Sequence, residues 1–180
     1  MIFAAIIMMA GFSTTVMAQT SAATTTDAGT TLIVPMTIAQ TAALHFGNVT
    51  LLTTAGGTVV LPSNSTVRAF TGGLSESTIG PIATNAAYNV TGTYNETYAL
   101  TLPATITVTE TIATTGVKTM TISALTVLFN LGIEKTGVAA TSTLSATGTD
   151  SFKVGGTLTV AASQIAGIYA GTFPVSVDYN

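Results

Sequence analysis

The end of the chain most constrains its fold, because thirteen residues there alternate in character without a break. In Ile168 to Asn180 every second side chain from Tyr169 to Tyr179 falls on one face, and all but one of these are large and apolar. The opposite face carries small and polar side chains. This period of two is typical of a β-strand with one buried face. Pro174 lacks the N–H that a ladder needs, so we expect part of this strand to lie at a sheet edge.

Composition extends this expectation to the whole chain. Only 6% of the 180 residues are charged, yet 47% are apolar, so the chain is not disordered. Thr and Val are abundant, whereas Glu, Lys, Arg and Gln, which favour helices, are scarce. The sequence therefore predicts an all-β fold in one domain, preceded by a separate N-terminal stretch.

The middle of the chain consists of short Thr- and Val-rich runs, separated by Gly, Pro, Asn and Ser at intervals typical of a sandwich. We expect strands near residues 58–61, 66–70, 87–91, 98–102, 106–111, 119–129, 151–154 and 156–161. Turns are expected between these runs, including one at Gly155-Gly156 and one across Gly132 to Ala139. The only helix expected is at most a single turn at Ala162 to Gly167.

Residues 1–18 indicate export. Ile2 to Val16 is an apolar run, and Val16-Met17-Ala18 fits a signal-peptidase site, so we expect a secretory signal peptide and a secreted, extracellular protein. Membrane contact is then expected only through this segment during export. No Lys or Arg precedes the apolar run. A retained hydrophobic segment within an assembly and a membrane helix are the two alternatives; the run is short for the second.

Residues 19–31 carry no large apolar side chain and are rich in Thr. They cannot bury enough surface to fold alone, so they form a flexible leader, a glycosylatable stalk or an extended arm that uses a partner. The sandwich domain is expected to span residues 32–180. It opens with the alternating residues Leu32, Val34, Met36 and Ile38, a pattern that predicts a strand, and Pro35 places that strand at an edge.

Several sequence patterns together resemble one family. They are Leu44 to Gly47, Gly56 to Leu61, Tyr88 to Gly92, Tyr98 to Pro103, Phe152 to Leu158, and Gly167 to Phe173 with the closing Tyr179-Asn180. In these the chain resembles the DUF4402 family, which implies a secreted bacterial β-sandwich of unassigned function. The closing strand resembles, more weakly, those of chaperone-usher pilins and spore-coat U-type domains. That likeness implies an immunoglobulin-like antiparallel β-sandwich, which a strand from a neighbouring subunit could complete.

Chemically reactive residues are few. His45 is the only histidine and cysteine is absent, so the sequence offers no His or Cys cluster for a metal and no thiolate nucleophile. We expect His45 to be a packed or rim residue. The seven carboxylates stand singly, and only a pair assembled in space could serve a glycosidase. We therefore expect no catalytic residues, no metal and no cofactor. The four isolated basic residues form no stripe for nucleic acid.

The edges lead to a functional hypothesis. A nearly uncharged sandwich with apolar edge strands needs something to cover them, and strand addition between subunits does so. The sequence thus favours a non-enzymatic structural subunit of an extracellular filament or pilus-like fibre, a head-to-tail homopolymer. The candidate interface residues are Leu32, Val34, Met36, Ile38, Tyr169, Phe173, Val175, Val177 and Tyr179. Either Leu32 to Ile38 or, if retained, Ile2 to Val16 would be inserted. The alternative is a monomeric secreted adhesion or carbohydrate-binding module, whose tyrosines would contact a surface glycan.

Overall fold

The computed structural model describes residues 21–52, 54–112, 115–130, 132 and 134–180. The chain divides into two units, one ending at Leu32 and one spanning Ile33–Asn180. In the first unit, the described residues 21–32 are exposed and form no helix or strand. The predicted signal peptide, residues 1–18, lies outside the described residues, as do the first two residues of the predicted leader.

The all-β prediction is confirmed, since the described residues form sixteen strands and no helix. The helical turn expected at Ala162 to Gly167 is therefore absent. The strands are β1 Thr37–Ala42, β2 His45–Phe46, β3 Val49–Leu51, β4 Gly57–Leu61, β5 Ala69–Phe70, β6 Leu74–Glu76, β7 Ala83–Thr84, β8 Ala86–Thr91, β9 Thr97–Thr101, β10 Ile106–Glu110, β11 Thr119–Phe129, β12 Glu134–Thr136, β13 Ala139–Thr143, β14 Thr149–Val160, β15 Tyr169–Ala170 and β16 Ser176–Tyr179.

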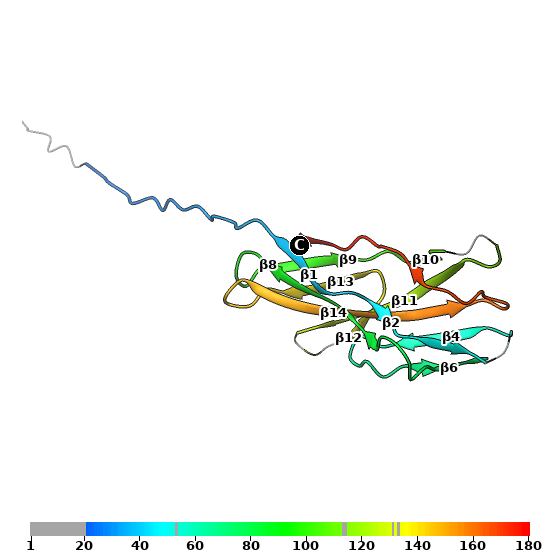
Figure 1. Cartoon of the computed structure of the whole chain (residues 1–180). Helices are drawn as coiled ribbons and strands as arrows, with labels where there is room; N and C mark the ends of the chain where they lie inside the picture. The colour runs from blue at the N-terminus through cyan, green and yellow to red at the C-terminus, as the bar shows by residue number, and fades with distance from the viewer. Residues whose placement is uncertain (1–20, 53, 113–114, 131, 133) are drawn as a thin grey trace, which may run out of the picture. The chain divides into compact units, whose positions relative to one another are not determined.

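A large sheet forms one layer, with the order β1-β8-β14-β11-β10-β15. Its two longest strands, β11 and β14, lie side by side along the domain (Figure 1). On the edge that faces away from β11, β14 pairs first with β8, through residues 149–154, and then with β4, through residues 156–160. β12 adds to β11, and β5 adds to β4. The large sheet is thus two consecutive halves that share the same pair of central strands.

A small sheet, β13-β9-β16, packs against one of these halves. Tyr98 of β9 meets Phe129 of β11 edge to face, with ring centroids 6.2 Å apart, and Phe129 meets Phe152 of β14 at 5.8 Å. All three rings are buried in one hydrophobic core. Every paired ladder is antiparallel. The two layers confirm the predicted antiparallel β-sandwich; its completion by a neighbour stays a prediction.

The turn predicted at Gly155-Gly156 is wrong, because β14 runs without interruption through both glycines. The end of β4 and the loop after it lie very close to Gly155. A Cβ at Gly155 would be 2.3 Å from Leu61 O and 2.5 Å from Ser63 N. Opposite these glycines β11 has a bulge between Ser123 and Thr126. Glycine here allows close approach rather than a turn, at the point where one half of the sheet gives way to the other.

The closing strand is also shorter than predicted. Residues 168–180 form β15, which pairs with β10 of the large sheet, and β16, which pairs with β9 of the small sheet. Gly171 to Val175 connects them without a ladder, so the chain crosses from one layer to the other there. Pro174 lies in this connection, where no ladder N–H is required. The predicted alternation is correct: the odd-numbered residues from Phe173 to Tyr179 are half-buried and their neighbours exposed.

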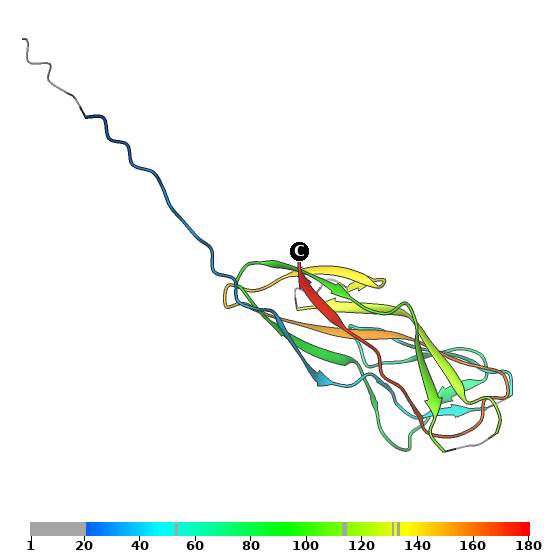
Figure 2. The ribbon, with the colours of Figure 1, turned by 90° about the horizontal axis from the view of Figure 1, so that it is seen from above.

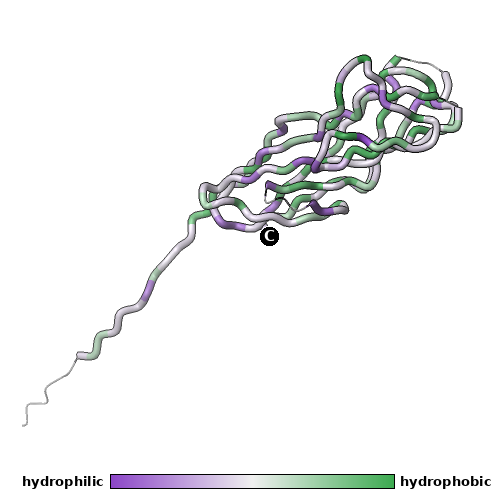
Figure 3. The backbone as a smooth tube through the Cα atoms, turned by 90° about the horizontal axis from the view of Figure 1, so that it is seen from below, coloured by the Kyte–Doolittle hydropathy of each residue, from purple (hydrophilic) through white to green (hydrophobic). Residues whose placement is uncertain are grey.

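The first strand starts later than predicted, at Thr37 rather than near Leu32. Its partner β8 ends at Thr91, opposite Thr37, so residues before Thr37 have no strand to pair with. Met36 and Ile38 pack against the core of their own domain. Leu32, Ile33 and Val34 remain exposed, by 90%, 62% and 56%. In Figure 3 the run before the domain is mostly pale or hydrophilic in colour, whereas the strands carry repeated hydrophobic colour.

Three features of the middle region depart from the sequence prediction. β12 lies inside the stretch expected to be a turn, Gly132 to Ala139, and β13 follows it directly. β5 is shorter than the expected strand. The short pairs β2-β7 and β3-β6 were not expected as sheets of their own. Two- and three-residue strands carry too few alternating positions for a period to show in the sequence.

Candidate binding groove

An apolar groove of about 780 Å³ lies between the segment 44–51, which holds β2 and β3, and the segment 164–169, which leads into β15. Strands β10, β11 and β14 form its floor. None of the residues that line it comes from β9, β13 or β16. The small sheet therefore takes no part in the groove, and the floor residues Ile122, Leu158 and Val160 are buried beneath its rims.

The floor is made of alternate residues of the large sheet. It comprises Val108, Met120, Ile122, Leu158 and Val160. Residues two apart in a strand point to the same face, so Met120 and Ile122 lie together, as do Leu158 and Val160. Leu158 pairs in register with Ile122, which brings the two strands' contributions side by side. The floor is a continuation of the face that buries the aromatic core in the other half of the sheet.

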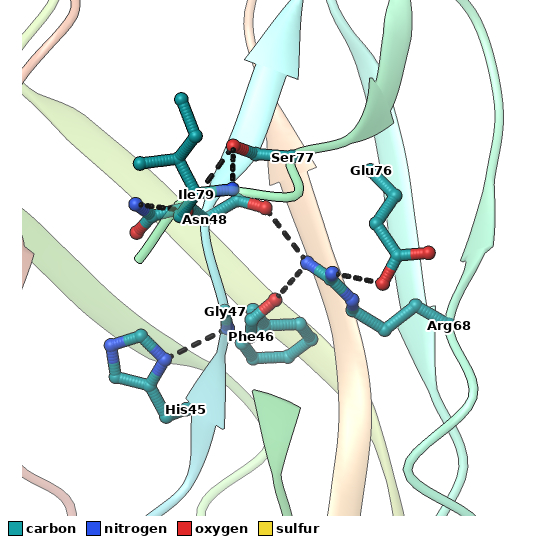
Figure 4. A network of polar contacts seen from close by, with 8 residues as sticks. All are labelled: His45, Phe46, Gly47, Asn48, Arg68, Glu76, Ser77 and Ile79. Atoms are coloured by element: carbon teal, nitrogen blue, oxygen red, sulfur yellow. Dashed lines mark hydrogen bonds and ion pairs between the residues drawn. The ribbon is translucent and has the colours of Figure 1, made fainter. Parts of the chain in front are cut away.

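The first rim is held by Arg68, as Figure 4 shows. Its Nη1 donates to Phe46 O (2.6 Å) and Asn48 O (2.9 Å), and its Nη2 contacts Glu76 Oε1 at 2.6 Å. The Arg68 side chain is 4% exposed and that of Glu76 is 66% exposed. Charge-assisted bonds from a buried guanidinium to two carbonyls fix the backbone on both sides of Gly47.

Gly47 makes this approach of Arg68 possible. Its φ is +67°, and a Cβ there would lie 2.9 Å from Arg68 Nη1. This positive φ favours glycine, which lets the backbone bend at this position. The neighbouring His45 is exposed, and its Nδ1 accepts a hydrogen bond from Gly47 N (2.8 Å). His45 lines the rim of the groove and caps the bend.

The second rim is organised by Gln164. Its Nε2 donates to Val117 O (2.7 Å) and to the Tyr169 hydroxyl (2.7 Å). That hydroxyl donates in turn to Ile165 O (2.7 Å). Gln164 is 7% exposed, yet its Oε1 has no hydrogen-bond partner, unlike every other buried side-chain N or O in the part of the chain that the structure describes. A buried acceptor in this state costs about 1–3 kcal/mol.

The predicted interface residues do not form one cluster. Tyr169 alone lines the groove. Phe173, Val175 and Val177 pack against the core. Tyr179 lies outside the groove. Its hydroxyl donates to Val34 O (2.5 Å) and accepts a hydrogen bond from Thr93 N (2.7 Å). Gln164 was missed by the sequence analysis, because its partner Val117 is 47 residues away and no local pattern connects the two.

The five tyrosines do not form a common sugar-binding face. Tyr88 and Tyr98 are buried in the core, and Tyr94 is exposed. The Tyr98 hydroxyl donates to Asp150 Oδ2 (2.9 Å), which also accepts from Ser142 Oγ (2.7 Å). Burial, followed by this hydrogen bond and the charge of Asp150, raises the pKa of Tyr98 far above its usual value. This polar cluster holds the small sheet to β14.

The described residues were compared with the requirements of a metal site and of a membrane-spanning helix. Within the described ranges no group of three or more His, Cys, Asp or Glu side chains could hold a metal ion. Across those same residues there is no helix that is long and apolar enough to cross a membrane.

The fold defines a class: an antiparallel β-sandwich whose larger sheet carries an apolar groove beside β2, β3 and β15. The chain belongs to the DUF4402 family, described as a domain of unknown function, whose family model matches residues 36–179. This confirms the resemblance seen in the sequence. A comparison with curated proteins finds no match. The weaker resemblances to pilins and spore-coat domains stay predictions.

Proposed function

We propose that this protein is a non-enzymatic structural subunit of an extracellular filament or pilus-like fibre, and that subunits join by strand addition. The observation that carries the proposal is the free edge of the strands that border the apolar groove. β2 and β3 each have a single ladder partner, β7 and β6, and β15 pairs only with β10. An added strand would satisfy those edges.

The edge strands lack the usual protection against such addition. β1, β2, β3 and β15 contain no Lys, Arg, Asp or Glu, and β16 contains only Asp178. Charged side chains, above all Lys, are how soluble sheets prevent edge pairing. β1 and β16 come into contact with one another, as Figure 2 indicates for the start and end of the domain. The uncharged edges of β2, β3 and β15 are consistent with a subunit that assembles.

The donor would come from the N-terminal arm, which we define as residues 21–34. All of the arm is exposed and none of it is in a strand. Of the two donor segments predicted from the sequence, Leu32 to Ile38 is partly used within its own domain, because β1 begins at Thr37 and pairs with β8. Ile2 to Val16 lies outside the described residues. Leu32, Ile33 and Val34 are the exposed large apolar residues of the arm.

An arm that adds to an edge strand of the next subunit makes a heterologous contact, because the two surfaces differ. Such contacts repeat without closing and generate open filaments. Export by the predicted signal peptide, residues 1–18, would place the subunits outside the cell. The proposed location is the surface of a bacterium, in keeping with the export signal expected from the sequence.

The test is electron microscopy and sedimentation of the purified chain that starts at residue 19. The wild type should form filaments, whereas Leu32→Thr combined with Ile33→Thr should leave monomers with an unchanged melting temperature, because neither side chain is buried in its own domain. Thr24→Ala with Thr25→Ala is the matched control and should still assemble. Filaments of undiminished yield from the Leu32/Ile33 variant would contradict the proposal.

The second candidate is a secreted adhesion or carbohydrate-binding module, and the groove itself favours it. Its volume falls within the range of about 300–1,000 Å³ found for small-molecule sites. His45, Asn48 and Tyr169 supply polar groups around the apolar floor. A protein of this kind should be monodisperse, and its melting temperature should rise with a glycan ligand.

A further inference from the structure

We infer that the end of the domain opposite Val34 is covered by a second copy of this chain, which contacts it with its own Ile33, Val34 and Tyr94. This inference rests on the proposed function and names the contact between consecutive subunits of the fibre. It arises from two sets of exposed apolar side chains, one at each end of the domain.

The far-end patch consists of Ile112, Val117 and Ile168, which are 76%, 40% and 66% exposed. Thr111 N donates to Ile168 O (3.0 Å), so the segment that carries Ile112 lies beside Ile168. Gln164 Nε2 donates to Val117 O (2.7 Å), which joins the segment before β11 to the segment before β15. Hydrogen bonds therefore hold the two segments of the patch together, while its apolar side chains reach solvent.

The far-end patch carries no charge of its own. Segments 111–117 and 161–168 contain no Lys, Arg, Asp or Glu, and the residues that flank the first segment are the buried Glu110 and Lys118. Exposed apolar patches mark interaction sites, and charged residues are depleted at the centre of interfaces. Ile168 also directly precedes β15, so the patch adjoins a free edge that the proposed fibre uses.

The near-end patch consists of Ile33, Val34 and Tyr94, which are 62%, 56% and 65% exposed. Val34 N donates to Thr93 Oγ1 (2.7 Å), so the patch lies just beyond the end of β8. The carbonyl of Val34 also accepts from the Tyr179 hydroxyl. The patch is therefore fixed to the domain, and its apolar side chains suit the uncharged far-end patch.

Strand β14 separates the two patches. It begins at Thr149, opposite Thr91 at the end of β8, and ends at Val160, directly before segment 161–168 (Figure 1). Twelve residues in extended conformation span roughly 36 Å. The two patches cannot meet within one molecule, so each subunit can engage one neighbour at each end. Contact between unlike ends repeats without closing and produces a linear fibre.

A lipid surface is the other class of partner that exposed aliphatic side chains fit. Lys118 is the only basic residue in or next to the two segments of the far-end patch, which leaves little attraction to anionic headgroups. The near-end patch, in contrast, supplies an apolar surface on the same chain. The observations therefore favour a second copy.

Disulfide cross-linking with Tyr94→Cys and Ile168→Cys tests the contact, because the chain contains no cysteine of its own. A disulfide requires Cα atoms within about 7 Å, so this pair can form one only between molecules. Mild oxidation of the chain that starts at residue 19 should give a ladder of covalent oligomers.

The matched control joins Tyr94→Cys to Val67→Cys. Val67 is 76% exposed and belongs to the loop after β4, a strand that ends opposite Gly156, partway along β14. This pair should cross-link at least about tenfold less, because only the end-to-end contact raises the local concentration of the two thiols.

Ile112→Ser combined with Ile168→Ser removes apolar side chains from the far-end patch and leaves its backbone hydrogen bonds in place. Association measured by sedimentation velocity should weaken at least about tenfold, because the contact no longer buries the two isoleucines. The melting temperature should not change, since both side chains are exposed. Val67→Ser with Val138→Ser, also at exposed positions, is the control and should assemble as the wild type does. Equal association of the two variants would overturn the far-end patch as the contact.

The outcomes separate this inference from the proposed function. Filaments by electron microscopy together with preferential Tyr94–Ile168 cross-links support both. Filaments that survive Ile112→Ser with Ile168→Ser overturn the far-end patch and leave the fibre intact. Cross-linked dimers through Ile168 without filaments support the contact and contradict the fibre. Monomers without cross-links contradict both, and their sedimentation with phosphatidylcholine vesicles would assign the far-end patch to lipid.

Discussion

Arg68 is the residue on which the first rim of the groove depends. Its buried guanidinium donates to Phe46 O and Asn48 O. The guanidinium carbon of Arg68 lies over the ring of Phe70, 5.1 Å from the ring centroid. The bond to Glu76 adds less, since that carboxylate is exposed and screened by solvent. The stability of the rim therefore comes from the two carbonyl contacts.

Arg68→Met should lower the free energy of unfolding by about 1–3 kcal/mol, because Phe46 O and Asn48 O lose a charged donor. Urea denaturation measures the loss. Lys153→Met is the control, since it removes an exposed cation from β14, and it should change stability by less than about 0.5 kcal/mol. Similar values for both variants would show that the Arg68 contacts do not stabilise the rim.

Tyr98 gives the fold a pH dependence on the alkaline side. Burial and the contact with Asp150 raise the pKa of its hydroxyl, and burial also raises that of Tyr88. Both groups keep their proton in the folded state above the pH at which an unfolded tyrosine loses it. Their contribution to stability is thus complete below about pH 10 and is lost as the pH rises.

Above about pH 10, each of these tyrosines should reduce the unfolding free energy by up to about 1.4 kcal/mol per pH unit. Denaturation between pH 8 and 11.5 measures the slope. Tyr98→Phe should make the slope shallower by about that amount, whereas Tyr94→Phe, at an exposed position, should leave it unchanged. A slope unaffected by Tyr98→Phe would contradict this assignment.

At the scale of elements, the strands with several alternating residues could be predicted and the shortest ones could not. Ala87 to Thr91 and Thr119 to Phe129 were found within a residue or two of β8 and β11. Where prediction failed, tertiary contacts decided. Gly155-Gly156 carries a turn-like sequence but serves close packing, and the end of β8 sets the start of β1.

Gly155→Ala tests the packing explanation. A Cβ 2.3 Å from Leu61 O requires β14 or the loop after β4 to move. We expect a loss of about 2–3 kcal/mol by chemical denaturation, in the range found for overpacked sites. Gly29→Ala has open space around it and should be neutral. A neutral Gly155→Ala would contradict the packing explanation.

At the scale of the whole molecule, the sequence indicated the class of fold and the free edges but not the groove. Tyr169 was identified from its place in the alternating run, and it does line the groove. Gln164 could not be found, because its role depends on Val117 and on floor strands that are distant in sequence. A site assembled from five segments leaves no local spacing to recognise.

The proposed fibre brings together two features of the molecule: the exposed apolar pair Leu32 and Ile33, and the free edges of β2, β3 and β15 beside the groove. Each would cost solubility if it stayed bare. In the proposed fibre they would cover each other between copies and leave one free arm and one free edge at the two ends of any oligomer. This complementarity is the basis of the proposed fibre.

Electron microscopy of material sheared from the native cell surface, with mass spectrometry of the N-terminal peptide, tests the central claim most directly. The account predicts regular filaments that contain this chain, starting at Gln19. Dispersed monomeric particles carrying the same peptide would contradict the fibre and favour the adhesion or carbohydrate-binding module.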